Sequence, residues 1–251
     1  MAKQRGVLKI EGTIDDLTFY KSRDGYLVRG KGGVSAERIA TDPAFQRTRE
    51  NGAEFARAGK ASRLLRTAFR TQLQAVRGQR TASRLTQEMM RVVHSDAVNG
   101  RGLRNVTDGE KTILQDFEFN PAAQLGSTLF APFTAALNRV SGEATVTIPS
   151  FVPANSVAAP AGATHFRILT TAASVDFDSE LYEVDDTASA TLALDGAATS
   201  ALSLVSTLTA NSTGTLFLVM GVEFFQVVNG TNYSLKNGGF NALTIVAVDQ
   251  L

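Results

Sequence analysis

Residues 42–76, DPAFQRTRENGAEFARAGKASRLLRTAFRTQLQAV, have the composition of one long helix around which the rest of the chain can be organised. Asp42 is a favoured N-cap residue, and Pro43 suits the first helical position, where its missing N–H costs nothing. At about 100° per residue, one face of this helix collects the apolar side chains Phe55, Ala58, Leu65, Phe69, Leu73 and Val76. A basic stripe beside that face consists of Arg49, Lys60, Arg63, Arg66, Arg70 and Arg77. The pattern predicts a helix that buries one face and offers a cationic edge to a partner.

Two glycines, Gly52 and Gly59, lie at the border of the apolar face. A glycine inside a helix costs about 1 kcal/mol relative to alanine. We therefore expect a packing reason for both, namely the close approach of another backbone. These features indicate a docking element and not a catalytic site.

The composition limits the chemistry available to the chain. Its 251 residues allow one large domain or two ordinary ones, and the absence of cysteine excludes disulfides, thiol nucleophiles and thiolate metal sites. His94 and His165 are the only histidines, the residue type whose ordinary pKa suits general acid–base catalysis near neutral pH. The sequence has neither a signal peptide nor an apolar run of about 18 residues, so we expect a cytoplasmic protein with no membrane-spanning segment. Association with a particle, or export without a signal peptide, stays open.

Charge is distributed unevenly along the chain. Residues 1–111 carry 22 Lys and Arg against 12 Asp and Glu, and residues 112–251 carry 3 against 12. Such opposed halves suggest a basic domain with an anionic partner, or a subunit whose basic end meets the acidic end of another copy. The alternative is that the two halves neutralise each other within one monomer.

The N-terminal residues 7–31 have the pattern of short β-strands joined by turns, with Asp24-Gly25 as a hairpin signal. These strands carry too little apolar surface to be stable alone. They could add to an open sheet edge of a neighbouring subunit, or form an ordinary hairpin packed on their own domain.

The order of elements predicts the fold class. Residues 83–98 form a second amphipathic pattern, with Leu85, Met89, Val92, Val93 and Ala97 inward. From Ser127 onwards, alternating strands separated by frequent turn signals indicate an antiparallel β-sandwich. We predict an α+β protein with a β-hairpin arm (1–35), a helical region (36–120) and a C-terminal antiparallel β-sandwich (121–251).

The best candidate for chemistry is an acidic run near the middle of the expected sandwich. Its carboxylates are Asp176, Asp178, Glu180, Glu183, Asp185 and Asp186. Alternating carboxylates suit calcium, but the run lacks the glycine and the final glutamate of an EF-hand loop. A glycosidase pair is a further alternative. We favour a solvated or partner-facing acidic patch, and we assign no catalytic, cofactor-binding or metal-ligating residue.

Two motifs in the first third of the chain resemble a family of uncharacterised bacterial proteins. The first comprises Gly12-Thr-Ile14, Phe19-Tyr20-Lys21, Gly25-Tyr26, Arg29 and Lys31-Gly32-Gly33. The second comprises Asp42-Pro43-x-Phe45-x-Arg47-Thr48-Arg49-Glu50-Asn51 and Glu54-Phe55. The resemblance implies that the N-terminal arm and the start of the helix form one module attached to a β-domain. It implies no activity and no catalytic residue.

These observations favour a non-enzymatic structural subunit that assembles with copies of itself into a filament, tube or shell. No small-molecule substrate is expected. The residues expected between subunits are Phe19, Tyr20, Tyr26, Arg29, Arg47, Arg49, Arg63, Arg66, Arg70, Asp176, Asp178, Glu180, Glu183, Asp185 and Asp186. The alternative is nucleic-acid binding through the arginine-rich helix. A carbohydrate-binding module is a third interpretation, which the absence of Trp disfavours.

Overall fold

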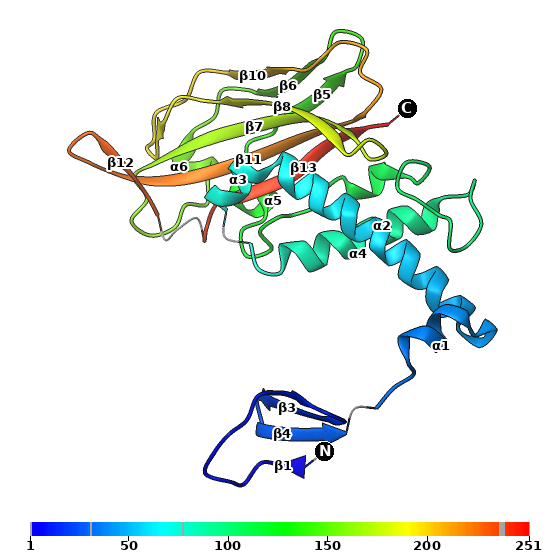
Figure 1. Ribbon diagram of the computed structural model, residues 1–251. Coiled ribbons are helices and arrows are strands. Elements are labelled where there is room, and N and C mark those ends of the chain that lie inside the picture. Colours follow the sequence, from blue (N-terminus) through cyan, green and yellow to red (C-terminus); the bar gives the residue numbers. More distant parts are fainter. Residues whose placement is uncertain (1, 31, 77, 236–238, 251) are drawn as a thin grey trace. The chain divides into compact units, whose positions relative to one another are not determined.

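The computed structural model describes residues 2–30, 32–76, 78–235 and 239–250 (Figure 1). The chain divides into two compact units, Met1–Asn51 and Gly52–Leu251. We call them the N-terminal unit and the main unit. The boundary falls inside α2 (Gln46–Ala68), a helix that belongs in part to each unit.

The N-terminal unit contains a four-stranded antiparallel sheet with the strand order β1-β4-β3-β2. The strands are β1 (Ala2–Lys3), β2 (Gly12–Ile14), β3 (Leu17–Ser22) and β4 (Gly25–Gly30). Ser22 pairs with Gly25, and Gly25 has a φ of 104°, so the expected hairpin forms where the Asp24-Gly25 signal placed it. The expected strand character of residues 7–10 is wrong, because the structure has no strand between Lys3 and Gly12.

The stretch predicted as one helix is divided into several elements. After α1 (Ala36–Thr41), Asp42 caps the 3-10 turn η1 (Pro43–Phe45) by accepting a hydrogen bond from the Ala44 N–H at 2.9 Å. Helix α2 follows, and α3 (Arg70–Ala75) begins after Phe69, whose backbone leaves the helical region. The break accompanies burial of the Phe69 ring, which packs edge-on against Phe119 with ring centroids 6.1 Å apart.

The predicted apolar face is correct except at one position. Ala58, Leu65, Phe69 and Val76 are buried and Leu73 is half-buried against the same core, whereas Phe55 is 60% exposed. The expected close approach at the two helix glycines is not present within the described chain, because a Cβ added at either position would meet nothing within 4 Å.

The main unit contains two antiparallel sheets. The smaller sheet has the order β10-β6-β5, and the larger has β12-β11-β7-β8, with β13 paired to β11 and β9 paired to β7. The strands are β5 (Thr134–Asn138), β6 (Glu143–Ile148), β7 (His165–Asp176), β8 (Leu181–Ala188), β9 (Leu192–Ala193), β10 (Leu202–Thr207), β11 (Thr215–Val228), β12 (Thr231–Ser234) and β13 (Ala242–Asp249). The remaining helical elements are α4 (Thr81–Ser95), η2 (Lys111–Leu114), α5 (Leu125–Thr128) and α6 (Pro153–Ser156).

The two central strands of the larger sheet, β7 and β11, are buried on both faces along most of their length. Even-numbered side chains of β7 and β11, such as Ile168 and Met220, face the smaller sheet, where they meet Val146 and Ile148 of β6. Odd-numbered side chains, such as Phe217 and Val219, face the helices and belong to the same core cluster as side chains of α2 and α4. Figure 1 shows these three layers, with α2 and α4 on one face of the large sheet and β10, β6 and β5 on the other. The fold is therefore α+β with a β-sandwich, and the second half of the expected helical region shares a core with that sandwich.

None of the helices among the described residues is long and apolar enough to cross a lipid bilayer. The amphipathic pattern of α4 is largely as predicted, with Leu85, Met89, Val92 and Val93 buried. The expected inward position of Ala97 is wrong, because the helix ends at Ser95 and Ala97 is exposed.

The shared core predicts that helices and sheets unfold together. Leu65 of α2 is fully buried in the cluster that contains Phe217 and Ile245. We expect Leu65→Ala to lower the free energy of unfolding by about 2–5 kcal/mol, because it removes buried methyl groups and leaves a cavity. In urea titrations, circular dichroism of the helices and a probe of the sheet should shift to the same lower midpoint. Leu103→Ala is the control, because Leu103 is 67% exposed and its truncation should leave the midpoint nearly unchanged.

Candidate functional site

The acidic run lies on the turn between β7 and β8 and along β8. On one face of β8, Asp185 Oδ2 accepts a hydrogen bond from the backbone N–H of Thr207 at 2.7 Å. Glu183 Oε1 accepts from the backbone N–H of Thr209 at 3.0 Å and from its hydroxyl at 3.1 Å. The two carboxylates therefore connect the large sheet to β10 and the residues after it, and they satisfy main-chain donors there.

The other carboxylates of the run have partners as well. Asp186 Oδ1 accepts from Gln72 Nε2 at 2.6 Å and from Thr171 Oγ1 at 2.8 Å, which ties α3 to the large sheet. Asp176 Oδ1 accepts from the backbone N–H groups of Asp178 and Ser179 in the turn. Hydrogen bonds from Ser179 and from the backbone of Asp178 lower the pKa of Asp176. The run is thus an internal connector, with carboxylates committed to bonds within the chain.

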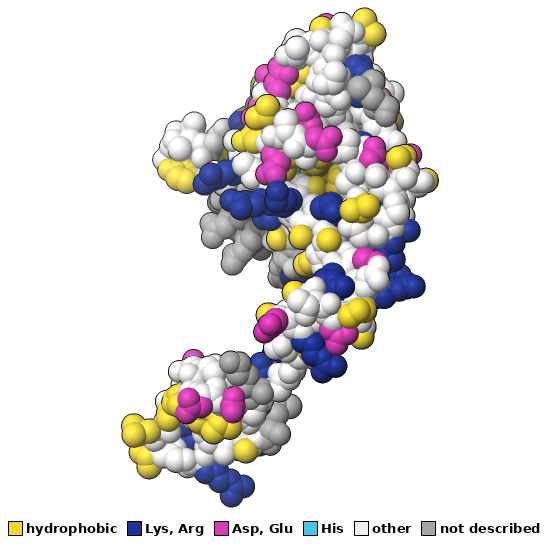
Figure 2. All heavy atoms as spheres, turned by 45° about the vertical axis from the view of Figure 1, so that its right-hand side comes forward, with side chains coloured by type: hydrophobic (Ala, Val, Ile, Leu, Met, Phe, Trp, Pro, Cys, Tyr) yellow, Lys and Arg dark blue, Asp and Glu magenta, His cyan; other side chains and the backbone are white. Residues whose placement is uncertain are grey.

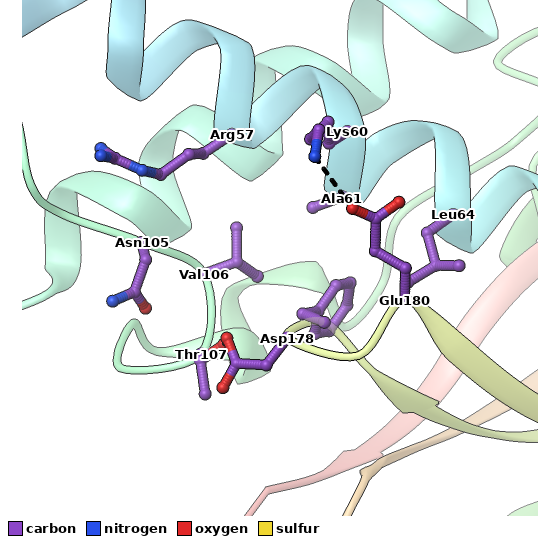
Figure 3. Close-up of a pocket in the computed structure, with 10 residues that line it drawn as sticks. Arg57, Lys60, Ala61, Leu64, Asn105, Val106, Thr107, Asp178 and Glu180 are labelled. Carbon is purple, nitrogen blue, oxygen red and sulfur yellow. Dashed lines mark hydrogen bonds and ion pairs between the residues drawn. The ribbon is translucent and has the colours of Figure 1, made fainter.

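A cavity of about 240 Å³ lies beside this turn, between α2 and the loop around Val106 (Figure 3). Lys60 Nζ lies 2.9 Å from Glu180 Oε1, and Thr107 Oγ1 donates to Asp178 Oδ1 at 2.7 Å. Arg57 donates from Nη1 to the carbonyl of Gly102 at 2.8 Å. Lys60, Arg57 and Thr107 thus direct their polar groups to partners within the main unit.

At this cavity, a basic side chain of the first half of the chain meets an acidic side chain of the second half. Residues 52–111 carry 12 Lys and Arg against 5 Asp and Glu, and residues 112–251 carry 3 against 12. Both segments belong to the main unit, and Lys60–Glu180 joins them directly. The sequence left open that the two charged halves neutralise each other within one monomer. The Lys60–Glu180 ion pair is one such contact between the basic helix and the acidic run.

No metal centre is formed by the part of the chain that the structure describes. Within that part, no group of three or more His, Asp or Glu side chains is arranged to hold an ion. Asp176 and Asp178, the first two carboxylates of the acidic run, bond to the backbone and to Thr107. The calcium interpretation gains no support from this arrangement.

Three buried charges that the sequence did not single out hold the loop after α4. Asp96 is 3% exposed and accepts from the backbone N–H groups of Val98 and Asn105 at 2.8 and 3.0 Å. Glu54 Oε1 accepts from the N–H of Gly102 at 2.7 Å, and Lys111 Nζ donates to the carbonyl of Thr107 at 2.6 Å. Burial lowers the pKa of Lys111. Asp96 and Lys111 bond to backbone groups nearby in the chain, whereas Glu54 reaches a backbone group 48 residues away.

The arginine stripe is not one uniform surface. Arg63 and Arg70 are exposed, and neither has a hydrogen-bond or ionic partner among the described residues. Arg66 is half-buried, and its Nε has no hydrogen-bond partner there. Arg49 is structural, because its Nη1 donates to the carbonyls of Ile39 and Asp42 at 2.7 and 3.0 Å. Arg47 is exposed, and Arg77 lies outside the described residues.

The aromatic residues of the N-terminal unit pair with cations across its small sheet. The Arg29 guanidinium lies 5.6 Å from the Tyr20 ring centroid, and Lys21 Nζ lies 5.5 Å from that of Tyr26. Phe19 is half-buried and is paired across the strands with Val28. These contacts stabilise the hairpin locally, and Phe19, Tyr20 and Tyr26 are each half-buried.

The N-terminal unit has no hydrophobic core of its own. From residue 2 to residue 50, no residue that the structure describes is buried. The most exposed apolar side chains are Val7 at 100%, Leu8 at 84%, Ile14 at 54%, Leu17 at 46% and Ile10 at 44%. Figure 2 shows hydrophobic side chains gathered on the surface of this unit, at the bottom of the view. A sheet of this kind is the most evident candidate for an interaction surface.

Comparison with known proteins gives no assignment: no protein-family model, curated protein or solved structure matches the chain. The resemblance of the two N-terminal motifs to an uncharacterised bacterial family stays a prediction.

Asp96 gives a testable pH dependence. Burial raises the pKa of Asp96, but hydrogen bonds from Asn99, Asn105 and Val98 outweigh it and lower the pKa from 3.8 to about 2. Because the folded pKa is the lower one, this stabilisation is complete above about pH 4 and is lost as the pH falls towards 2. We expect Asp96→Asn to cost roughly 1–3 kcal/mol at pH 7. Urea titrations at pH 7 and at pH 2.5 should show that the difference from the wild type shrinks in acid; an equal difference at both would contradict this role.

Proposed function

We propose that the protein is a non-enzymatic structural subunit that assembles with copies of itself into a polymer. The observation that carries this proposal is the N-terminal unit, which exposes Val7, Leu8 and Ile14 and buries no described residue. Covering a valine or leucine side chain is worth about 1.5–3 kcal/mol. A partner that covers several of them would supply the stabilisation that a small sheet lacks by itself.

A polymer is the expected assembly if the two units of the chain present different binding surfaces. If the N-terminal unit of each copy binds a different surface on the next copy, the contact is heterologous and generates rings or open helices. The outer strands β1 and β2 also offer edges to which another strand can add. The commitment of the acidic run and of the cavity to internal bonds supports a structural role over an enzymatic one. Assembly would occur in the cytoplasm or as part of a particle.

The test is a pair of surface variants of the full chain. Val7→Asp/Leu8→Asp should abolish assembly, because it places two carboxylates in the surface that must be desolvated. The matched control is Val140→Asp/Leu181→Asp, which changes two apolar side chains of the main unit that are 72% and 67% exposed. The measurements are sedimentation velocity and negative-stain electron microscopy of nuclease-treated protein at low and high salt. We expect polymers of the wild type and of the control variant, and none of the Val7→Asp/Leu8→Asp variant. A monomeric wild type, or a polymeric Val7/Leu8 variant, would contradict the proposal.

A second candidate function is nucleic-acid binding, which is favoured by the exposed Arg63 and Arg70, neither of which has a partner among the described residues. Such binding releases counterions and weakens steeply with salt. If it occurs, Arg63→Glu/Arg70→Glu should weaken binding of a labelled oligonucleotide and flatten its salt dependence, as measured by fluorescence anisotropy. Equal binding by the wild type and this variant would exclude the helix as the nucleic-acid surface.

A further inference from the structure

A groove with two chemically different halves runs along the outer side of the helices of the main unit. One half is a cavity of about 460 Å³ lined by Phe55 of α2 and by Ala82 and Met90 of α4. The other half, of about 290 Å³, is lined by Arg66, Arg70 and again Ala82. Ala82 lines both cavities, so the two halves are adjacent at the start of α4.

The apolar half is unusual for a free surface. Phe55 is 60% exposed, although the periodicity of its helix places it with residues that are buried. Large exposed aromatic side chains beside other apolar groups are typical of interaction sites. Met90 is half-buried beside it and adds a flexible apolar contact. This half of the groove suits aliphatic side chains.

The other half is cationic. The Arg66 Nε is buried and has no hydrogen-bond partner among the described residues, and Arg70 is exposed. Helix α4 begins here, and its N-cap residue Arg80 supplies no side-chain hydrogen bond to the first turn. The positive end of the α4 dipole therefore adds to the field of the two arginines. This half suits carboxylates.

The N-terminal unit carries a turn with the complementary chemistry. Between β2 and β3 the chain runs Ile14-Asp15-Asp16-Leu17. Ile14 and Leu17 are 54% and 46% exposed, and Asp15 and Asp16 are exposed with no partner among the described residues. Two aliphatic side chains thus flank two free carboxylates.

We propose that the groove lined by Phe55, Met90, Arg66 and Arg70 on one copy receives the Ile14–Leu17 turn of a second copy. Ile14 and Leu17 cover the apolar half, while the two aspartates meet the two arginines. The inference rests on the proposed self-assembly and names the surface that receives the N-terminal unit. Because donor and acceptor surfaces differ, the contact repeats head to tail from copy to copy.

Charge reversal on each side tests the contact in the full chain. Arg70→Glu and Asp16→Lys should each weaken self-association about tenfold or more, because each places like charges together in the interface. Combining Arg70→Glu with Asp16→Lys should restore a large part of the lost association, since the pair is again opposite in sign. Phe55→Ser should weaken association without any change of charge.

Two exposed residues provide matched controls. Arg63→Glu changes an arginine of the same helix that does not line the groove, and Asp24→Lys changes an aspartate in the other turn of the same small sheet. Both should associate like the wild type in sedimentation velocity over a concentration series, and circular dichroism should show every variant folded.

The outcomes separate this inference from the proposed function. The groove is not the receiving surface if the Arg70→Glu and Phe55→Ser variants associate like the controls. The same holds if combining Arg70→Glu with Asp16→Lys restores no association. Self-assembly itself is tested separately, by the Val7→Asp/Leu8→Asp variant. If the wild type is monomeric at every concentration, self-assembly itself fails. Loss in the single variants with recovery in the exchanged pair would establish the contact.

Discussion

The structure of the main unit depends on the pairing of β7 with β11, whose side chains are buried on both faces. Eleven residue pairs, from Thr215 with Val175 to Phe225 with His165, are in antiparallel register. Because successive side chains of a strand point to opposite faces, one register supplies two cores at once. The smaller sheet closes one core, and α2 and α4 close the other. A shift of register by one residue would exchange the two sets of side chains and disrupt both cores.

Polar contacts then fix the layers that this pair organises. Asp185 and Glu183 connect β8 to the main chain after β10, and Asp186 connects the large sheet to α3 through Gln72. Lys60 and Glu180 add an exposed ion pair between α2 and the β7–β8 turn. Exposed pairs contribute little to stability, so the hydrogen bonds of the β8 carboxylates are the more important part of this connection.

The N-terminal unit contrasts with this double core. Its hairpin is locally well determined, with a glycine at a left-handed turn position and cation–π contacts between Arg29 and Tyr20. Its apolar side chains nevertheless point to solvent, as Val7 and Leu8 do. The main unit builds two cores, whereas the described residues of the N-terminal unit build none, and we propose that a second copy of the chain covers the apolar side chains left exposed.

The sequence alone determined the features that depend on local chemistry. Alternation and turn residues specified the antiparallel sandwich, helical periodicity specified the buried face of α4, and Asp24-Gly25 specified a hairpin, because each acts over a few neighbouring residues. Only the tertiary structure decided the features that depend on distant partners. The long helix is interrupted at Phe69, whose ring packs against Phe119. Asp186 accepts a hydrogen bond from the side chain of Gln72. Burial of a side chain is set by whatever packs over it, and no local pattern records residues that lie a hundred positions away.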